Sequence, residues 1–173
     1  MPYTVKPLSC EPAKIKCMSE RLIISHYENN YGGAAKRLNL IDEQLAQLEF
    51  DKAAGFLING LKREQLIAMN SMILHELFFD GLGNESEPRG LLHEAIVRDF
   101  GSFERWRSEF VAMGKALGGG SGWVLLSWSP RDRKLPVGSR SLPHFGRWHA
   151  NPSARYVRAL LSHGFWRQGR QLC

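Results

Sequence analysis

Residues 19–45, SERLIISHYENNYGGAAKRLNLIDEQL, decide how this chain begins to fold. Their apolar side chains recur at the spacing of an amphipathic helix, at Leu22, Ile23, Tyr27, Tyr31, Ala34, Ala35, Leu38, Ile41 and Leu45. Ser19 stands just before them and can cap the helix, because its hydroxyl can accept a hydrogen bond from an amide of the first turn. Gly32 and Gly33 weaken the middle of the pattern, so we expect one long helix with a kink at that pair.

A second helix is expected over Lys62–Leu77. One of its faces carries Leu66, Met69, Ile73 and Leu77, which again follow helical spacing. Two amphipathic helices that follow one another along the chain pack as an antiparallel pair. The sequence therefore predicts a helical hairpin in the N-terminal half.

Helices and then a strand follow the hairpin. Gly81–Pro88 is a loop by composition, and Leu91–Ile96 begins a third helix. Ser102 opens a fourth helix, which ends before the run Gly118-Gly119-Gly120. Trp123–Trp128 is apolar and short, as a buried strand would be.

Helices first and strands afterwards indicate an α+β fold. We expect an N-terminal antiparallel helical hairpin over residues 1–82, and then a mixed half of helices and a small antiparallel sheet over residues 83–135. We expect this sheet to be incomplete. Residues 136–173 form an atypical tail, in which Pro136, Pro143 and Pro152 predict irregular structure.

The net charge of +6 lies in the tail rather than in the body of the chain. Residues 136–173 contain no Asp, Glu or Lys, but they carry Arg140, Arg147, Arg155, Arg158, Arg167 and Arg170. The remaining basic and acidic residues balance. A basic tail could contact nucleic acid or another anionic surface, but a neutral body makes nucleic acid an improbable main partner.

Composition places the chain among ordinary globular proteins. Of its 173 residues, 43% are hydrophobic and 23% charged, and eighteen consecutive apolar residues occur nowhere. The first residues lack the layout of a secretory signal, and Cys10, Cys17 and Cys173 form no paired framework. We therefore expect a cytoplasmic protein with reduced thiols and no membrane partner.

Two histidines sit inside the predicted hairpin among apolar neighbours, His26 in one helix and His75 in the other. Each histidine alone is more often a hydrogen-bonded core residue than a metal ligand. Facing each other across the hairpin, they could present two imidazoles to one ion. Spacing alone leaves both interpretations open.

An ordered set of motifs resembles the iron/manganese superoxide dismutases. His26, Asn39 and the segment His75-Glu76-Leu77-Phe78-Phe79 are similar to the first two ligand segments of that family. The family's central block is matched in order by Asp99-Phe100-Gly101-Ser102-Phe103-Glu104-Arg105-Trp106 and then by Gly120-Ser121-Gly122-Trp123-Val124-Leu125-Leu126. The resemblance covers residues 1–135.

The resemblance implies one iron or manganese ion per chain, held by three histidines and one aspartate, with superoxide as the substrate. His26 and His75 match the first two ligands, while Trp123 and Phe79 match aromatic positions that wall the site. Ala34 stands where most members carry a gateway tyrosine, and we take Tyr31 as the candidate catalytic phenol in its place. Members of the family dimerise near the metal, so a homodimer is implied as well.

The third histidine and the aspartate come, in the family, from a C-terminal Asp-x-Trp/Tyr-Glu-His segment. Residues 133–173 contain no carboxylate side chain, so the chain as given carries half of the ligand set, which puts its own activity in doubt. His144, His149 and His163 are weak substitutes, because a redox site needs oriented partners around each ligand.

A changed reading frame would explain the tail. Codons can be chosen for Ala154 to Trp166 that, when read one nucleotide later, spell Leu-Asp-Met-Tyr-Glu-His-Ser-Tyr-His-Met-Asp-Phe, which contains the absent ligand motif. We hypothesise a frame change between Leu135 and Gly138. The alternative reading is a non-catalytic, dismutase-like protein that binds nucleic acid or anionic surfaces through its basic tail.

Overall fold

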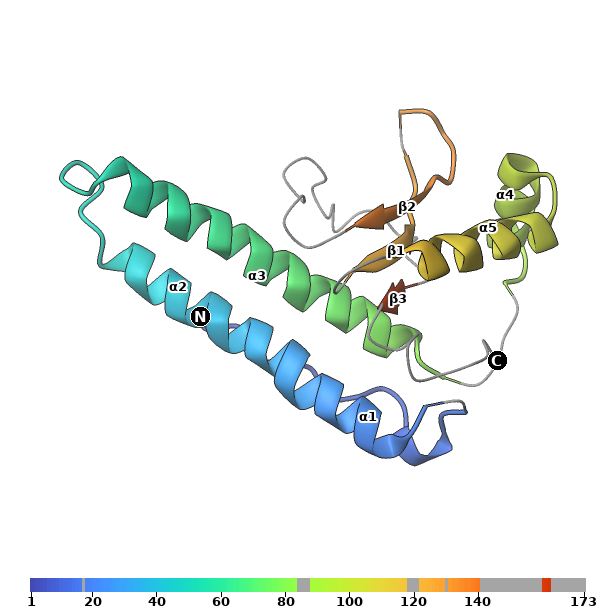
Figure 1. The fold of residues 1–173 in the computed structure, drawn as a ribbon, viewed down its shortest axis with the longest axis horizontal. Helices are drawn as coiled ribbons and strands as arrows, with labels where there is room; N and C mark the ends of the chain where they lie inside the picture. Colours follow the sequence, from blue (N-terminus) through green and yellow to red (C-terminus); the bar gives the residue numbers. More distant parts are fainter. Residues whose placement is uncertain (17, 84–87, 118–121, 130, 141–159, 163–173) are drawn as a thin grey trace.

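The N-terminal half of the chain is a helical hairpin (Figure 1). The computed structural model describes residues 1–16, 18–83, 88–117, 122–129, 131–140 and 160–162. Helices α2 (Gly32–Ala46) and α3 (Gly55–Gly81) lie side by side and run in opposite directions. The short turn η1 (Pro12–Lys14) and helix α1 (Glu20–Ser25) precede them. The expected antiparallel hairpin is confirmed.

The first long helix is interrupted one turn earlier than the kink we expected. Between α1 and α2 lies a π-helical segment, η2 (His26–Tyr31), whereas Gly32 and Gly33 are part of the regular helix that follows. The Asn29 side chain donates to the Ser25 carbonyl at 2.9 Å. This side-chain donor competes with the backbone amides of the helix for the Ser25 carbonyl, which accounts for the irregular turn. The Ser19 cap is confirmed, because its hydroxyl accepts from the Leu22 amide at 3.2 Å.

Two helices and a small sheet make up the second half. Helix α4 spans Leu91–Phe100, and α5 spans Phe103–Ala116 with Ser102 as its N-cap. The strands are β1 (Trp123–Leu126), β2 (Val137–Arg140) and β3 (Leu160–Ser162). They form an antiparallel sheet in the order β2-β1-β3, with Val124 opposite Ser139 and Leu161. The α+β class is confirmed.

Two of these strands lie within residues 136–173, where the sequence predicts irregular structure. The structure describes residues 136–140 and 160–162 of that segment. A buried strand such as β1 needs hydrogen-bond partners for its backbone groups along both edges. Backbone pairing needs no apolar pattern in the partner, so the prolines and arginines of the tail gave no sign of it.

Strand β1 joins the two hydrophobic clusters of the molecule. Successive side chains of a strand point to opposite faces. Trp123 packs in the cluster of the helical hairpin, while Val124 and Leu126 pack in a second cluster with residues of α4 and α5. The alternation therefore places the Trp123 ring beside the hairpin. Among the described residues, none of the helices combines the length and the apolar character that crossing a membrane requires.

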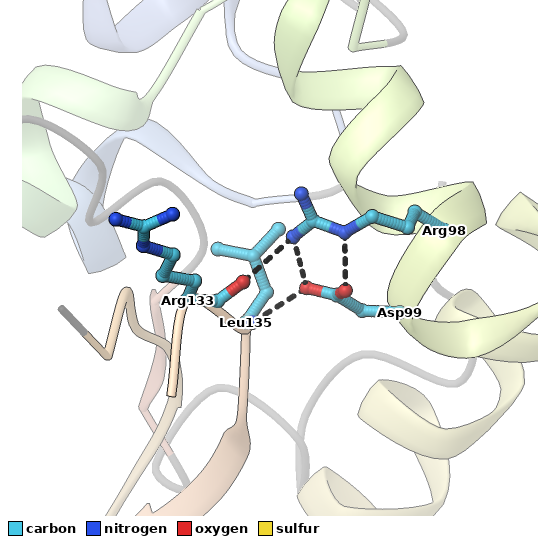
Figure 2. A network of polar contacts seen from close by, with 4 residues as sticks. All are labelled: Arg98, Asp99, Arg133 and Leu135. Carbon is cyan, nitrogen blue, oxygen red and sulfur yellow. Dashed lines mark hydrogen bonds and ion pairs between the residues drawn. The ribbon is translucent and has the colours of Figure 1, made fainter. Parts of the chain in front are cut away.

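Asp99, next to the end of α4, ties this helix to the turn that leads into β2. Figure 2 shows its carboxylate between two donors: the Arg98 guanidinium and the Leu135 amide, which donates to Oδ2 at 2.7 Å. Arg98 also donates to the Arg133 carbonyl at 3.0 Å. The Arg98 hydrogen bonds are the main cause of a lowered pKa at Asp99. The network holds Leu135, which is 4% exposed, in the second cluster.

Replacing Asp99 with asparagine should lower the free energy of unfolding by about 1–3 kcal/mol, the usual cost of weakening a hydrogen bond to a group held out of water. The Asp99 side chain is 6% exposed, so water cannot replace its lost partners. Chemical denaturation monitored by circular dichroism measures the change. Glu49→Gln is the matched control, because Glu49 forms an exposed ion pair with Lys52 and should leave stability unchanged. Equal effects of both substitutions would contradict the role given to Asp99.

Candidate metal centre

His26 and His75 lie against each other inside the hairpin. His26 is the first residue of η2, and His75 projects from the C-terminal third of the long helix α3. Their ring centroids are 4.9 Å apart. The His75 residue is 5% exposed, and His26 is half-buried. The structure thus brings together the two histidines that the sequence singles out.

A hydrogen bond to the backbone fixes the tautomer of His75. Its Nδ1 lies 2.6 Å from the carbonyl oxygen of Ser71, one helical turn earlier. A carbonyl can only accept, so the proton is on Nδ1 and the lone pair is on Nε2. Metal-binding histidines are commonly oriented in this way, with one ring nitrogen donating to a carbonyl and the other left for the metal.

Both imidazoles are held in the neutral form that binds metals. The pKa of His26 is lowered to about 4, mainly by burial and then by the neighbouring His75, against a hydrogen bond with Asn30 that raises it. Burial also lowers the pKa of His75, against its bond to Ser71. A neutral imidazole offers a lone pair, while a protonated one does not. At neutral pH the pair is therefore ready to act as ligands without first losing protons.

Aromatic rings close around the pair. The edge of Trp123 meets the His75 ring at a centroid distance of 4.9 Å, and Phe79 lies 5.8 Å from His26. Phe78 also lies 5.8 Å from His26. Trp123 and Phe79 are 2% and 3% exposed. The two residues expected to wall the site do contact the histidines, and they exclude water on that side.

Tyr31 also packs against His75. Its ring is nearly parallel to the imidazole, with centroids 6.4 Å apart. The phenol accepts from the Lys6 amide at 3.0 Å and donates to the Glu76 carboxylate at 2.9 Å. Burial is the main cause that raises the pKa of Tyr31 to about 12. The phenol therefore keeps its proton throughout the neutral range.

The sequence did not point to Glu76 or Lys6 as partners of this phenol. Glu76 was visible only as the residue after His75, and Lys6 lies far away along the chain. A carboxylate directly after a buried histidine, in an apolar stretch of helix, is the one signal that could have drawn attention to Glu76.

The donor set fits an iron or manganese ion in part. Two neutral imidazoles suit either ion. Within the described residues, no group of three or more histidine, cysteine, aspartate or glutamate side chains could hold a metal. His144, His149 and His163, the substitute ligands considered from the sequence, lie outside the described residues. In the described part of the chain, His26 and His75 are thus two candidate donors of the four that the resemblance implies.

The sequence of the chain is similar to known superoxide dismutases. The sequence profile of the iron/manganese superoxide dismutases, C-terminal domain, matches residues 88–145. The Fe superoxide dismutase of Cupriavidus metallidurans is 65% identical over 135 residues, which cover 78% of this chain and 68% of the relative. Superoxide dismutase [Mn] 2 of Haloferax volcanii is 33% identical, covering 78% and 67%. The mitochondrial Mn enzyme of Branchiostoma floridae is 31% identical, covering 69% and 83%.

Proposed function

The chain belongs to the iron/manganese superoxide dismutase family, and from this premise we propose that it dismutates superoxide at a metal ion that His26 and His75 help to bind. The observation that carries the proposal is the ring contact between the buried His75 and the half-buried His26, and burial lowers the pKa of both imidazoles. Relatives named for iron and for manganese both match the chain. The cofactor is accordingly iron or manganese.

The residues around the two histidines would have separate tasks. When bound, the ion supplies one-electron redox chemistry, by which one superoxide becomes dioxygen and a second, with two protons, becomes hydrogen peroxide. Ser71 orients His75 through its carbonyl. Trp123 and Phe79 keep water away from the histidines, which strengthens electrostatic interactions around them. The Tyr31 ring stacks on His75 while its hydroxyl donates to Glu76, so the residue keeps a phenol proton near the histidines, where the reduction consumes protons.

The experiment that tests this function is dismutation by the purified chain after refolding with iron and, separately, with manganese. Metal content per chain and turnover per bound metal are measured on the same samples. Stoichiometric metal with turnover supports the proposal. A folded chain that retains neither metal would contradict it, and far-UV circular dichroism establishes whether the chain has folded.

Tyr31→Phe should slow turnover per bound metal on the order of tenfold, because the phenol proton held against Glu76 is lost while the ring on His75 remains. Metal content should stay unchanged, since the imidazoles are untouched. Tyr3→Phe is a matched control, because Tyr3 is exposed and binds Asn39 through its backbone groups, whereas Tyr31 stacks on His75. Equal turnover in the Tyr31 variant and the parent chain would remove Tyr31 from the mechanism.

The remaining ligands are, in our proposal, encoded in another reading frame of the tail. The support is the fit of the Asp-x-Tyr-Glu-His motif to an alternative reading of Ala154–Trp166, at the place and in the order that the family requires. Reading the third bases of these codons tests it directly. Bases that cannot spell the aspartate and histidine in the shifted frame would end the hypothesis.

Three narrower expectations remain proposals: an antioxidant role in the cell, a homodimer, and a cytoplasmic location. The free thiol of Cys10 agrees with a reducing compartment. The second candidate function is a non-catalytic protein that binds anionic surfaces through its basic tail. The relatives named above do not support it, because all are named as superoxide dismutases.

A further inference from the structure

A polar network lies behind Tyr31, on the side of the ring that carries its hydroxyl. The phenol donates to Glu76 Oε1 at 2.9 Å and accepts from the Lys6 backbone amide at 3.0 Å. The second carboxylate oxygen, Glu76 Oε2, pairs with the Lys6 ammonium at 2.8 Å. Each oxygen of Glu76 therefore has its own partner, and the phenol uses both its donor and an acceptor site.

The network joins three parts of the chain that are distant in sequence. Lys6 belongs to the N-terminal segment, Tyr31 ends η2, and Glu76 follows His75 in α3. The N-terminal segment is fixed at two more points: Asn39 binds both the amide and the carbonyl of Tyr3 at 2.8 and 2.9 Å, and Tyr27 donates to the Lys6 carbonyl. The Lys6 amide is therefore a fixed donor rather than an occasional one.

The π-helical turn explains how Tyr31 reaches this place. A π-helix takes more residues per turn than an α-helix, so residues five apart come back closer to the same face. His26 begins η2 and Tyr31 ends it, which lets both face α3. On α3, consecutive residues present His75 to the Tyr31 ring and Glu76 to the Tyr31 hydroxyl.

We propose that Glu76 is a positioning residue, which holds the Tyr31 ring against His75 by accepting the phenol hydrogen bond. The inference rests on the proposed function, since it gives Glu76 its effect on catalysis through Tyr31. A hydrogen bond to a charged acceptor is roughly twice as strong as one between neutral groups. The Glu76 side chain is 17% exposed, so water competes little for this bond. Lys6 holds the carboxylate from the solvent side.

The first measurement concerns the metal-free chain and needs no activity. With ring-labelled tyrosine and histidine, the nuclear Overhauser effect between Tyr31 and His75 protons reports their contact. We expect Glu76→Ala to weaken it at least twofold. Glu76→Gln, which keeps an acceptor oxygen and the shape of the side chain, should restore most of it. Glu64→Gln is the matched control on the same helix, because Glu64 pairs with Arg37 far from Tyr31.

The second measurement is a double-mutant cycle on the metal-loaded chain. Glu76→Ala should slow turnover per bound metal about tenfold, and Glu76→Gln less. In a Tyr31→Phe background, Glu76→Ala should add little, because a residue that acts through Tyr31 has no effect once the phenol is gone. A residue that merely supported the fold would slow both backgrounds equally.

The outcomes separate this inference from the proposed function. A wild-type chain without metal or turnover overturns the function, while the nuclear Overhauser effect still reports on the contact. Normal turnover in the wild type, with an unchanged Tyr31–His75 contact in Glu76→Ala, overturns the positioning role alone. If Glu76→Ala fails to fold, the Glu76→Gln variant decides. An unchanged Tyr31–His75 contact and unchanged turnover support the acceptor role. A loss of turnover as large as that of Tyr31→Phe contradicts it.

Discussion

His75→Gln should lose at least about 100-fold in affinity for iron and manganese, since removing even an outer partner of a ligand commonly costs 10–100-fold. Turnover should fall with the metal content. Glutamine approximates the volume of the imidazole, so the wall of Trp123 and Phe79 stays packed. The same substitution at His26 should have an effect of similar size, because the two rings form one contact. Metal content after refolding and dialysis, measured by atomic emission, gives the result.

His93→Gln is the control for the histidine variants. His93 lies in α4, is exposed, and stacks on Phe103 at 5.9 Å, away from the hairpin. It should leave metal content and turnover unchanged. Wild-type metal content in both the His26 and His75 variants would show that the ion binds elsewhere. A uniform loss in all three histidine variants would point to a general effect on folding instead.

A chain whose residues from Leu135 onward are replaced by the alternative reading frame should bind metal tightly and gain on the order of 100-fold in turnover per chain over the sequence as given. The reason is the number of donors: the described residues offer two imidazoles, and the alternative frame adds an aspartate and a histidine. Ligands that complete a coordination shell raise affinity and fix the geometry on which redox chemistry depends.

The control for the tail is the same replacement with its aspartate and histidine changed to asparagine and glutamine. It keeps the length and composition of the new tail but not its donors, so the gain should disappear. Full turnover by the sequence as given would contradict the proposal that its ligand set is incomplete. An equal gain in the control would assign the effect to folding of the sheet.

Interactions between residues close in sequence allowed the helix caps and the helical hairpin to be predicted. Ser19 and Ser102 cap α1 and α5 because each hydroxyl meets an amide three residues later. The hairpin follows from apolar spacing along two consecutive stretches. His26 and His75 each sit inside one of these helices, so the sequence allowed them to face each other, and the structure shows that they do. In every case the partner lies within the same element or on the adjacent one.

The sequence by itself therefore determined the hairpin, the helix caps and the α+β class. The tertiary structure alone decided the pairing of β1 with β2 and β3 and the distant polar partners of Tyr31 and Asp99. Tyr31 and Glu76 are 45 residues apart, and Asp99 and Leu135 are 36 apart. Spacing encodes which face of a helix is apolar, but only the folded backbone selects which distant donor meets which acceptor.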